Sequence, residues 1–268
     1  MLIRYGHQLT TVQLPSCPFS KFEIRWCNQL TTVQLLSSPH LSKLVIGSCH
    51  SLKSLQLPSC PSLFDLEISW CDQLTSVQLQ LQVPSLPCLE ELKLRGVREE
   101  ILWQIILVSS SLKSLHIWNI NDLVSLPDDL LQHLTSLKSL EIWSCYELMS
   151  LFQGIQHLGA LEELQIYHCM RLNLSDKEDD DGGLQFQGLR SLRKLFIGGI
   201  PKLVSLPKGL QHVTTLETLA IINCDDFTTL PDWISYLTSL SKLDILNCPR
   251  LKLENRSKIA HIREIDIH

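Results

Sequence analysis

Apolar positions recur along the chain in one fixed order, Leu-x-x-Leu-x-Ile-x-x-Cys, with conservative exchanges between aliphatic residues. One copy runs through Leu41, Leu44, Ile46 and Cys49. In the middle of each copy, apolar residues alternate with more polar ones, which is the pattern of a short β-strand with one buried face. Copies begin at residues 19, 41, 63, 89, 112, 137, 161, 192, 216, 240 and, more weakly, 262.

The spacing of the copies predicts the fold. Their starts lie 22 to 26 residues apart, with a single longer interval of 31. Periods of about 20–29 residues are typical of leucine-rich repeats, whose strands stack into a parallel sheet over an aliphatic ladder. We therefore predict an α/β solenoid over residues 1–268, of about eleven repeats with a partial first repeat. It would be a leucine-rich-repeat horseshoe with a concave parallel β-sheet and an irregular or short-helical convex side.

A second recurring segment, such as Leu30-x-x-Val33, follows the ninth position and is predicted to turn the chain away from the strand. In later copies a Pro follows, and then apolar residues three or four apart, which favours a one-turn helix on the convex side. The tighter early copies are expected to lack this helix. The helices are expected at 128–134, 208–213 and 232–237, and the recurring His133, His157 and His212 are expected to be solvated.

Cysteine occupies the ninth position of most copies, where Val97, Ile120 and Ile200 stand in others. This exchange indicates a site for a compact buried apolar group rather than for thiol chemistry. The chain has ten cysteines but no Cys-x-x-Cys pair, so we predict neither a zinc site nor a redox dithiol. The ninth-position cysteines are Cys27, Cys49, Cys71, Cys145, Cys169, Cys224 and Cys248.

The charge pattern limits the possible partners. The net charge is −5 with a pI near 6.0, and Lys and Arg are scattered rather than clustered. Nucleic acids and anionic membranes require a basic stripe, so we expect neither as a partner. No apolar run approaches the ~18 residues of a membrane span. The N-terminus lacks the apolar core of a secretory signal, which favours a cytoplasmic location.

The longest interval between copies contains an acidic segment at 175–183. Four of the six residues from Asp176 to Asp181 are Asp and one is Glu. Its spacing does not match a calcium-binding loop of the Asp-x-Asp-x-Asp-Gly type. A solvated loop inserted into one repeat is the favoured interpretation. A role in covering the concave face, or in contacting a basic neighbour, stays open.

The repeats SLKSLEIWSCYELMSL (136–151) and SLSKLDILNCPRLKL (239–253) resemble the leucine-rich-repeat region of plant nucleotide-binding disease-resistance proteins of the coiled-coil type. The resemblance covers residues 19 to about 253. It implies a protein partner: a pathogen effector, a guarded host protein or the nucleotide-binding domain of a receptor. No Gly-x-x-x-x-Gly-Lys-[Ser/Thr] loop occurs, so no nucleotide cofactor is predicted. The alternative function is the substrate-recognition region of a ubiquitin-ligase adaptor.

Function in a solenoid is expected at the concave strand positions that the aliphatic ladder leaves exposed. Trp118, Trp143 and Tyr167 occupy the same position in three consecutive copies, and strands ~4.8 Å apart would bring their rings into one strip. Exposed aromatic side chains are enriched at interface hot spots. We therefore predict a protein-binding surface, with mere support of the sheet by ring stacking as the alternative. Its predicted residues are Trp118, Trp143, Tyr167, His116, His168 and Phe196.

Two further groups of residues are interpreted without assigning them a function. Trp26 and Trp70 come one position later in their copies, where packing in the turn is the expected role. Concave carboxylates such as Glu67, Glu141 and Asp244 lie in separate copies among neutral residues. No nucleophile elbow, His-Glu-x-x-His motif or glycine-rich phosphate loop occurs, so we predict no catalytic site, metal or cofactor and no enzymatic activity.

Overall fold

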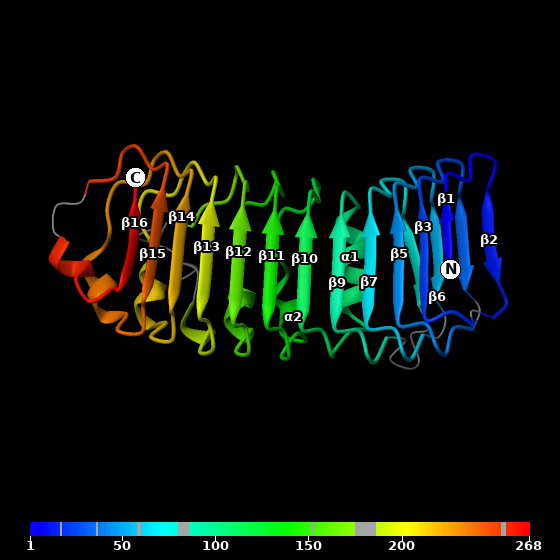
Figure 1. Ribbon diagram of the computed structural model, residues 1–268, viewed down its shortest axis with the longest axis horizontal. Coiled ribbons are helices and arrows are strands. Elements are labelled where there is room, and N and C mark those ends of the chain that lie inside the picture. The colour runs from blue at the N-terminus through cyan, green and yellow to red at the C-terminus, as the bar shows by residue number, and fades with distance from the viewer. Residues whose placement is uncertain are drawn as a thin grey trace. The chain divides into compact units, whose positions relative to one another are not determined.

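The computed structural model describes the chain except for residues 17, 36, 58–59, 80–85, 152, 175–185 and 253–255. The chain divides into two compact units, residues 1–122 and 123–268. In each unit, one short strand per repeat enters a parallel sheet in chain order (Figure 1). This confirms the leucine-rich-repeat fold, and one continuous solenoid over 1–268 stays a prediction.

The main sheet of the first unit repeats one register from strand to strand. Leu44 pairs with Phe22 on one side and Leu66 on the other, so equivalent positions lie side by side. These side chains are buried and form the predicted aliphatic ladder. The strands, in order, are β1 (Leu2–Arg4), β3 (Lys21–Arg25), β5 (Lys43–Gly47), β7 (Asp65–Ser69), β9 (Glu91–Arg95) and β10 (Ser114–Trp118).

The first unit contains a second parallel sheet where the sequence analysis expected only turns. Its strands are β2 (Thr11–Leu14), β4 (Thr32–Leu35), β6 (Ser54–Leu57) and β8 (Ser76–Leu79). Each segment alternates polar and apolar residues, as in Thr-Val-Gln-Leu, and the apolar residues of β4 and β6 are buried. The similar sequences of these segments, TVQL, TVQL, SLQL and SVQL, align them in register, so their backbone groups can pair between copies.

An unpredicted helix, α1 (Glu99–Ile106), follows β9 and packs near β8, the last strand of the second sheet. Its buried residues are Ile101, Leu102, Ile105 and Ile106. The side-chain oxygen Oε1 of Gln104 accepts a hydrogen bond from the backbone N–H of Val77 in β8 at 2.8 Å. A backbone donor at the edge of the sheet is thereby satisfied by the helix.

The second unit has one parallel sheet and short helical segments instead of the second sheet. The predicted helices are confirmed at three places, and His133, His157 and His212 beside them are exposed, as expected. The strands are β11 (Ser139–Trp143), β12 (Glu163–Tyr167), β13 (Lys194–Gly198), β14 (Thr218–Ile222), β15 (Lys242–Leu246) and β16 (Glu264–Ile267). The helical segments are α2 (Asp128–Leu131), η1 (Gln153–His157), η2 (Phe186–Gly188), η3 (Lys208–His212), η4 (Asp232–Tyr236) and η5 (Arg256–Ile259).

The ninth-position cysteines are buried, which confirms the interpretation of this position as part of the core. Their thiols also donate to the carbonyl oxygen two residues earlier, as in Cys49 Sγ to Gly47 O at 3.4 Å. Burial raises the pKa of Cys169 and of Cys224 to about 11. The thiol is therefore a small apolar group that also satisfies a carbonyl at the end of the strand.

The residue after each main-sheet strand, through β15, has a left-handed backbone, which the sequence analysis did not anticipate. These residues have φ between 51° and 58°. The left-handed turn lets the chain leave the strand sharply, and Gly or Asn adopts it with the least strain. Nevertheless Trp26, Trp70 and His168 occupy this column, which therefore presents large rings at the strand exits. Its members are Tyr5, Trp26, Ser48, Trp70, Gly96, Asn119, Ser144, His168, Gly199, Asn223 and Asn247.

Candidate functional site

The structure places the six predicted site residues on two units. His116 and Trp118 belong to β10 in the first unit. In the second unit, Trp143 ends β11, Tyr167 ends β12, His168 follows it, and Phe196 is central in β13. The predicted contact between Trp143 and Tyr167 lies entirely within the second unit. We call Trp143, Tyr167, His168 and Phe196 the aromatic face.

Three rings of the aromatic face, those of Trp143, Tyr167 and His168, are in contact, whereas Phe196 has Gln165 as its register partner on β12. Trp143 and Tyr167 are register partners on β11 and β12, and their ring centroids are 5.4 Å apart at an interplanar angle of 50°. The ring of His168 lies 6.2 Å from that of Tyr167. Tilted contacts at such distances are favourable for aromatic pairs. Trp143 nevertheless remains 40% exposed, so this contact leaves much of its surface available.

Two glycines, one at the end of β13 and one directly after it, give the rings of Tyr167 and His168 room to lie flat. A β-carbon on Gly198 would come within 2.3 Å of Tyr167 Cε1, and one on Gly199 within 2.5 Å of His168 Nδ1. Both rings therefore extend over the next repeat instead of pointing straight outward. Burial raises the pKa of Tyr167, which agrees with a ring half-covered by its neighbours.

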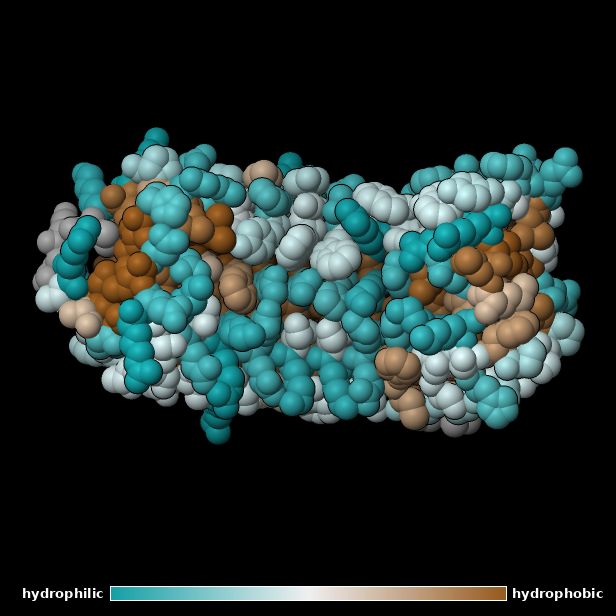
Figure 2. Space-filling view, viewed as in Figure 1, coloured by the Kyte–Doolittle hydropathy of each residue, from teal (hydrophilic) through white to brown (hydrophobic). Residues whose placement is uncertain are grey.

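Apolar residues continue the same column beyond the glycines. Ile222 ends β14 and Leu246 ends β15, and both are partly exposed. Figure 2 shows an apolar surface over β14 and β15. A partner bound to the aromatic face could therefore bury aliphatic as well as aromatic surface.

The corresponding column of the first unit begins with a network of charges. Arg25 Nε donates to Glu23 Oε1 at 2.6 Å, and Arg25 Nη2 to Glu67 Oε1 at 3.2 Å. Glu67 is two strands away on β7, and Gly47 lies between them on β5. A β-carbon on Gly47 would come within 3.1 Å of Arg25 Nη1, so the absence of a side chain at position 47 leaves room for the guanidinium. The charges of Arg25, Glu23 and Glu67 therefore compensate one another within the protein.

The column ends differently, in a cluster of Trp70, Arg95 and Trp118 that we call the Arg95 cluster. The Arg95 guanidinium carbon lies 5.0 Å from the ring centroid of Trp70 and 5.8 Å from that of Trp118. His116 contacts Trp118 edge-on, with ring centroids 5.4 Å apart. Cations at these distances from aromatic faces are attracted by the ring quadrupole.

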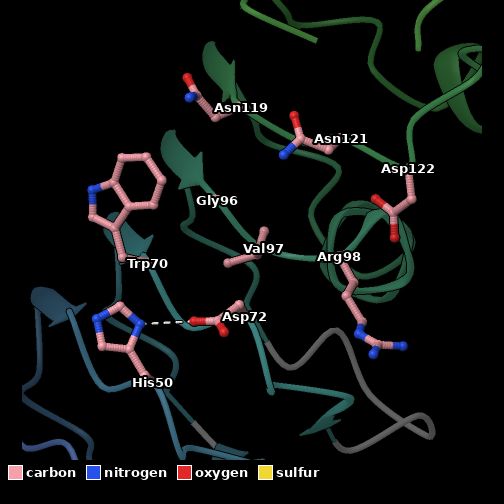
Figure 3. A pocket seen from close by; sticks show the side chains of 9 residues that line it. All are labelled: His50, Trp70, Asp72, Gly96, Val97, Arg98, Asn119, Asn121 and Asp122. Atoms are coloured by element: carbon pink, nitrogen blue, oxygen red, sulfur yellow. Dashed lines mark hydrogen bonds and ion pairs between the residues drawn. The ribbon is translucent and has the colours of Figure 1, made fainter. Parts of the chain in front are cut away.

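A groove of 710 Å³ adjoins the Arg95 cluster at the strand exits (Figure 3). His50 Nδ1 and Asp72 Oδ1 are 2.8 Å apart on one side of it, and the hydrogen bond from His50 lowers the pKa of Asp72. Side-chain amides are present on the other side. The groove is lined by His50, Trp70, Asp72, Gly96, Val97, Arg98, Asn119, Asn121 and Asp122.

The residues of the aromatic face were selected from the sequence, whereas Trp70, Trp26 and Arg95 were not. Trp70, expected to pack in a turn, packs on Gly96 yet remains 38% exposed and lines the groove. Trp26 stacks on Tyr5 at 5.0 Å and is 36% exposed. Arg95 was not among the predicted site residues. Its position in the sequence, equivalent to that of Trp118 in the next copy, could have indicated that the two side chains are neighbours. The acidic segment 175–183 lies outside the described residues.

Two further features of the described residues concern metal ions and membranes. Among the residues that the structure describes, no cluster of three or more His, Cys, Asp or Glu side chains could hold a metal ion. Within the same residues, no helix has both the length and the apolar composition needed to cross a membrane.

Comparison with known proteins identifies the type of repeat. The family described as "Plant disease resistance protein RPS2-like, leucine-rich repeats" matches residues 8–170. A comparison with curated sequences gives no significant match.

Solved structures with similar folds come from several sources. The leucine-rich repeat domain of the type III effector XCV3220 (XopL) is 20% identical, with 91% of this chain and 75% of that chain covered and a TM-score of 0.47. An internalin from Listeria monocytogenes is 15% identical, with 98% and 88% covered and a TM-score of 0.47. A chain of the Drosophila Toll–Spatzle complex is 16% identical, with 96% and 44% covered and a TM-score of 0.49.

Proposed function

Because the chain belongs to the RPS2-like leucine-rich-repeat family of plant disease resistance proteins, we propose that it recognises pathogen effectors, or host proteins that effectors modify, in plant defence. The repeats form a scaffold for protein interaction. The nucleotide-binding domain of a receptor is a further partner under this proposal, and the site of action is the cytoplasm.

The aromatic face is the observation that carries the proposal. Trp143 is 40% exposed at the end of β11 beside a half-buried Tyr167, and partly exposed aliphatic residues continue the same column on β14 and β15. Large rigid rings bury much area on binding at little cost in side-chain entropy, and they are enriched at interface hot spots. Support of the sheet alone would not require an indole to remain this exposed.

Proximity labelling in plant leaf cells tests the proposal. The full chain is compared with a Trp143→Ala/Tyr167→Ala variant, with Trp118→Ala as a separate variant for the first unit. Tyr236→Ala serves as the control, because Tyr236 is an equally large aromatic residue, 64% exposed, in η4 away from the strands. All variants must first show the same unfolding midpoint and solubility.

The proposal predicts that defined host or pathogen proteins are labelled by the parent chain and the Tyr236 control but not by the double variant. Each labelled protein is then purified and its affinity for the parent and the variants is measured. Loss of a central hot-spot pair should weaken binding by about tenfold or more. An unchanged set of partners with the double variant contradicts the proposed surface. Recovery of cullin-ligase subunits would support a ubiquitin-ligase adaptor instead.

A further inference from the structure

We infer that Arg95 is an anchor for a carboxylate on the protein partner, so that the partner must present an Asp or Glu side chain to the Arg95 cluster. The inference rests on the proposed function in taking a protein as the ligand, and it adds the chemistry by which the first unit would select that protein.

The position of Arg95 makes its guanidinium accessible. Arg95 is the last residue of β9 and is exposed, with Ser69 of β7 and Trp118 of β10 as its register partners. Its guanidinium contacts the rings of Trp70 at 5.0 Å and Trp118 at 5.8 Å. Over the part of the chain that the structure describes, Arg95 has no ion pair with a carboxylate.

Arg25 provides a comparison within the same column. Arg25 is bonded to Glu23 at 2.6 Å and to Glu67 at 3.2 Å, and its side chain is 27% exposed. The protein therefore satisfies one arginine of this column with two carboxylates of its own. Arg95 is held instead by two aromatic rings, which attract the cation without occupying its hydrogen-bond donors.

The rings also fix the direction of the guanidinium. Trp70 is held against Gly96, where a β-carbon would come within 2.4 Å of its Cε3 atom. A guanidinium stacked on rings keeps its in-plane N–H groups available, and this planar fork matches the two oxygens of a carboxylate. Because the side chain is already ordered, less entropy is lost when a carboxylate binds.

The surrounding charges favour a carboxylate over a phosphate. Lys93, the other cation on the exposed side of β9, is already paired with Glu91 at 2.6 Å. A phosphate group carries nearly two negative charges and is best held by more than one cation, whereas a carboxylate matches a single guanidinium. The whole chain is also acidic, with a net charge of −5, which disfavours a polyanionic ligand.

The adjoining groove gives the rest of the partner a place to bind. Trp70 belongs to both the groove and the Arg95 cluster, and Asn119 and Asn121 present amides on the far side of the groove (Figure 3). Side-chain amides can donate to and accept from a peptide backbone. A peptide whose acidic side chain reaches Arg95 could therefore continue along the groove.

Selection of peptides from a random library on the purified full chain tests the inference without any knowledge of the natural partner. The parent chain is compared with Arg95→Gln and with Arg95→Lys, which keeps the charge but removes the planar fork. Arg263→Gln is the matched control, because Arg263 is an exposed arginine of the second unit outside the groove and its loss changes the net charge equally. Folding of all four proteins is compared by thermal unfolding.

We expect the parent and Arg263→Gln to enrich peptides with Asp or Glu at one fixed position, and both Arg95 variants to lose that preference. A selected peptide should bind Arg95→Gln and Arg95→Lys at least about tenfold more weakly, and replacing its acid by the amide should weaken binding to the parent equally.

Three outcomes overturn the inference: no enriched sequence on the parent, the same acidic preference on Arg95→Gln, or an equal loss on Arg263→Gln. Tighter binding when phosphoserine replaces the selected acid would also overturn the choice of a carboxylate. The proposed function is tested in cells by the Trp143→Ala/Tyr167→Ala variant of the second unit, which leaves Arg95, Trp70 and Trp118 in place, so the two failures are distinguishable. Loss of the acidic preference leaves the labelling experiment unaffected, and an empty labelling result leaves the peptide selection unaffected.

Discussion

The indole of Trp70 lies directly on Gly96, at a place where any side chain at position 96 would collide with it. A β-carbon there would be 2.4 Å from Trp70 Cε3 and 2.8 Å from Cζ3. Both residues are in the left-handed column, one at the exit of β7 and the other at the exit of β9. This contact sets the position of the ring against which Arg95 is held, and so links the backbone turn to the proposed anchor.

Gly96→Ala should destabilise the first unit and move Trp70. A non-glycine residue at φ +56° costs about 1–2 kcal/mol, and the collision with the indole adds to it. Gly96→Asn separates the two effects, because Asn occupies this column at residues 119, 223 and 247 and accepts the backbone angle, yet it still collides. Chemical unfolding and tryptophan emission are the measurements. Gly159→Ala is the control, since the added carbon would approach nothing closer than Gly188 O at 3.7 Å. Unchanged emission in both Gly96 variants would contradict the contact.

Trp143→Ala should affect binding far more than stability. The side chain is 40% exposed, and a cross-strand aromatic pair contributes only about 0.2–1 kcal/mol to stability. Leu140→Ala on the same strand removes a fully buried ladder residue and should cost about 2–5 kcal/mol. Urea unfolding of the two variants checks this difference. A cost for Trp143→Ala as large as that of Leu140→Ala would favour the alternative in which the aromatic face mainly supports the sheet.

The buried cysteines should resist alkylation in the native protein. Burial raises the pKa of Cys169 and Cys224 to about 11, so almost no thiolate is present at neutral pH, and the core excludes the reagent. Cys88 is exposed and should react first. Brief treatment with iodoacetamide, followed by peptide mass spectrometry, measures the order of labelling. In denaturant, Cys169, Cys224 and Cys88 should all react, and fast labelling of Cys169 or Cys224 without denaturant would show that the solenoid opens locally.

Glu23 should contribute stability that is lost in acid. Its burial alone would raise the pKa, but hydrogen bonds and charges from Arg25 and Arg4 outweigh this and hold the pKa below 4.5. A carboxyl with a lowered folded-state pKa stabilises the fold fully above its unfolded pKa and loses this effect as the pH falls through the folded value. The Glu23 side chain is 30% exposed, so the contribution should not exceed about 1 kcal/mol.

Comparison of the parent chain with Glu23→Gln by urea unfolding tests this dependence. The difference in unfolding free energy should be present at neutral pH and should shrink toward zero as the pH falls below 4.5. Glu264→Gln, at an exposed position in β16, controls for the removal of one carboxylate. A difference that stays constant from neutral to acid pH would show that the effect of Glu23→Gln is not electrostatic.

The sequence by itself determined the repeat, the main strands and the buried positions. One aliphatic pattern recurs at a nearly constant period, and each copy packs its aliphatic residues against those of its neighbours in the same way. Burial of Leu44, Ile46 and Cys49 therefore follows from the pattern in any single copy. The neighbouring positions of Trp143 and Tyr167 follow as well, because a shared register places equivalent residues side by side. The alternation in segments such as 32–35 also contained the signal of the second sheet, which we took for a turn.

The tertiary structure alone decided what happens between non-equivalent positions. Trp70 lies over Gly96 because a left-handed turn directs the ring toward the next repeat. The pattern of apolar residues in the sequence does not indicate this backbone angle. The interaction partners of Arg25 and Arg95 likewise depend on the three-dimensional arrangement of the side chains. Arg25 reaches Glu67 across Gly47 and is satisfied, whereas Arg95 lies against Trp70 and Trp118 and has no carboxylate partner among the described residues. Repeats fix which residues are neighbours, but side-chain reach and direction decide which neighbours interact.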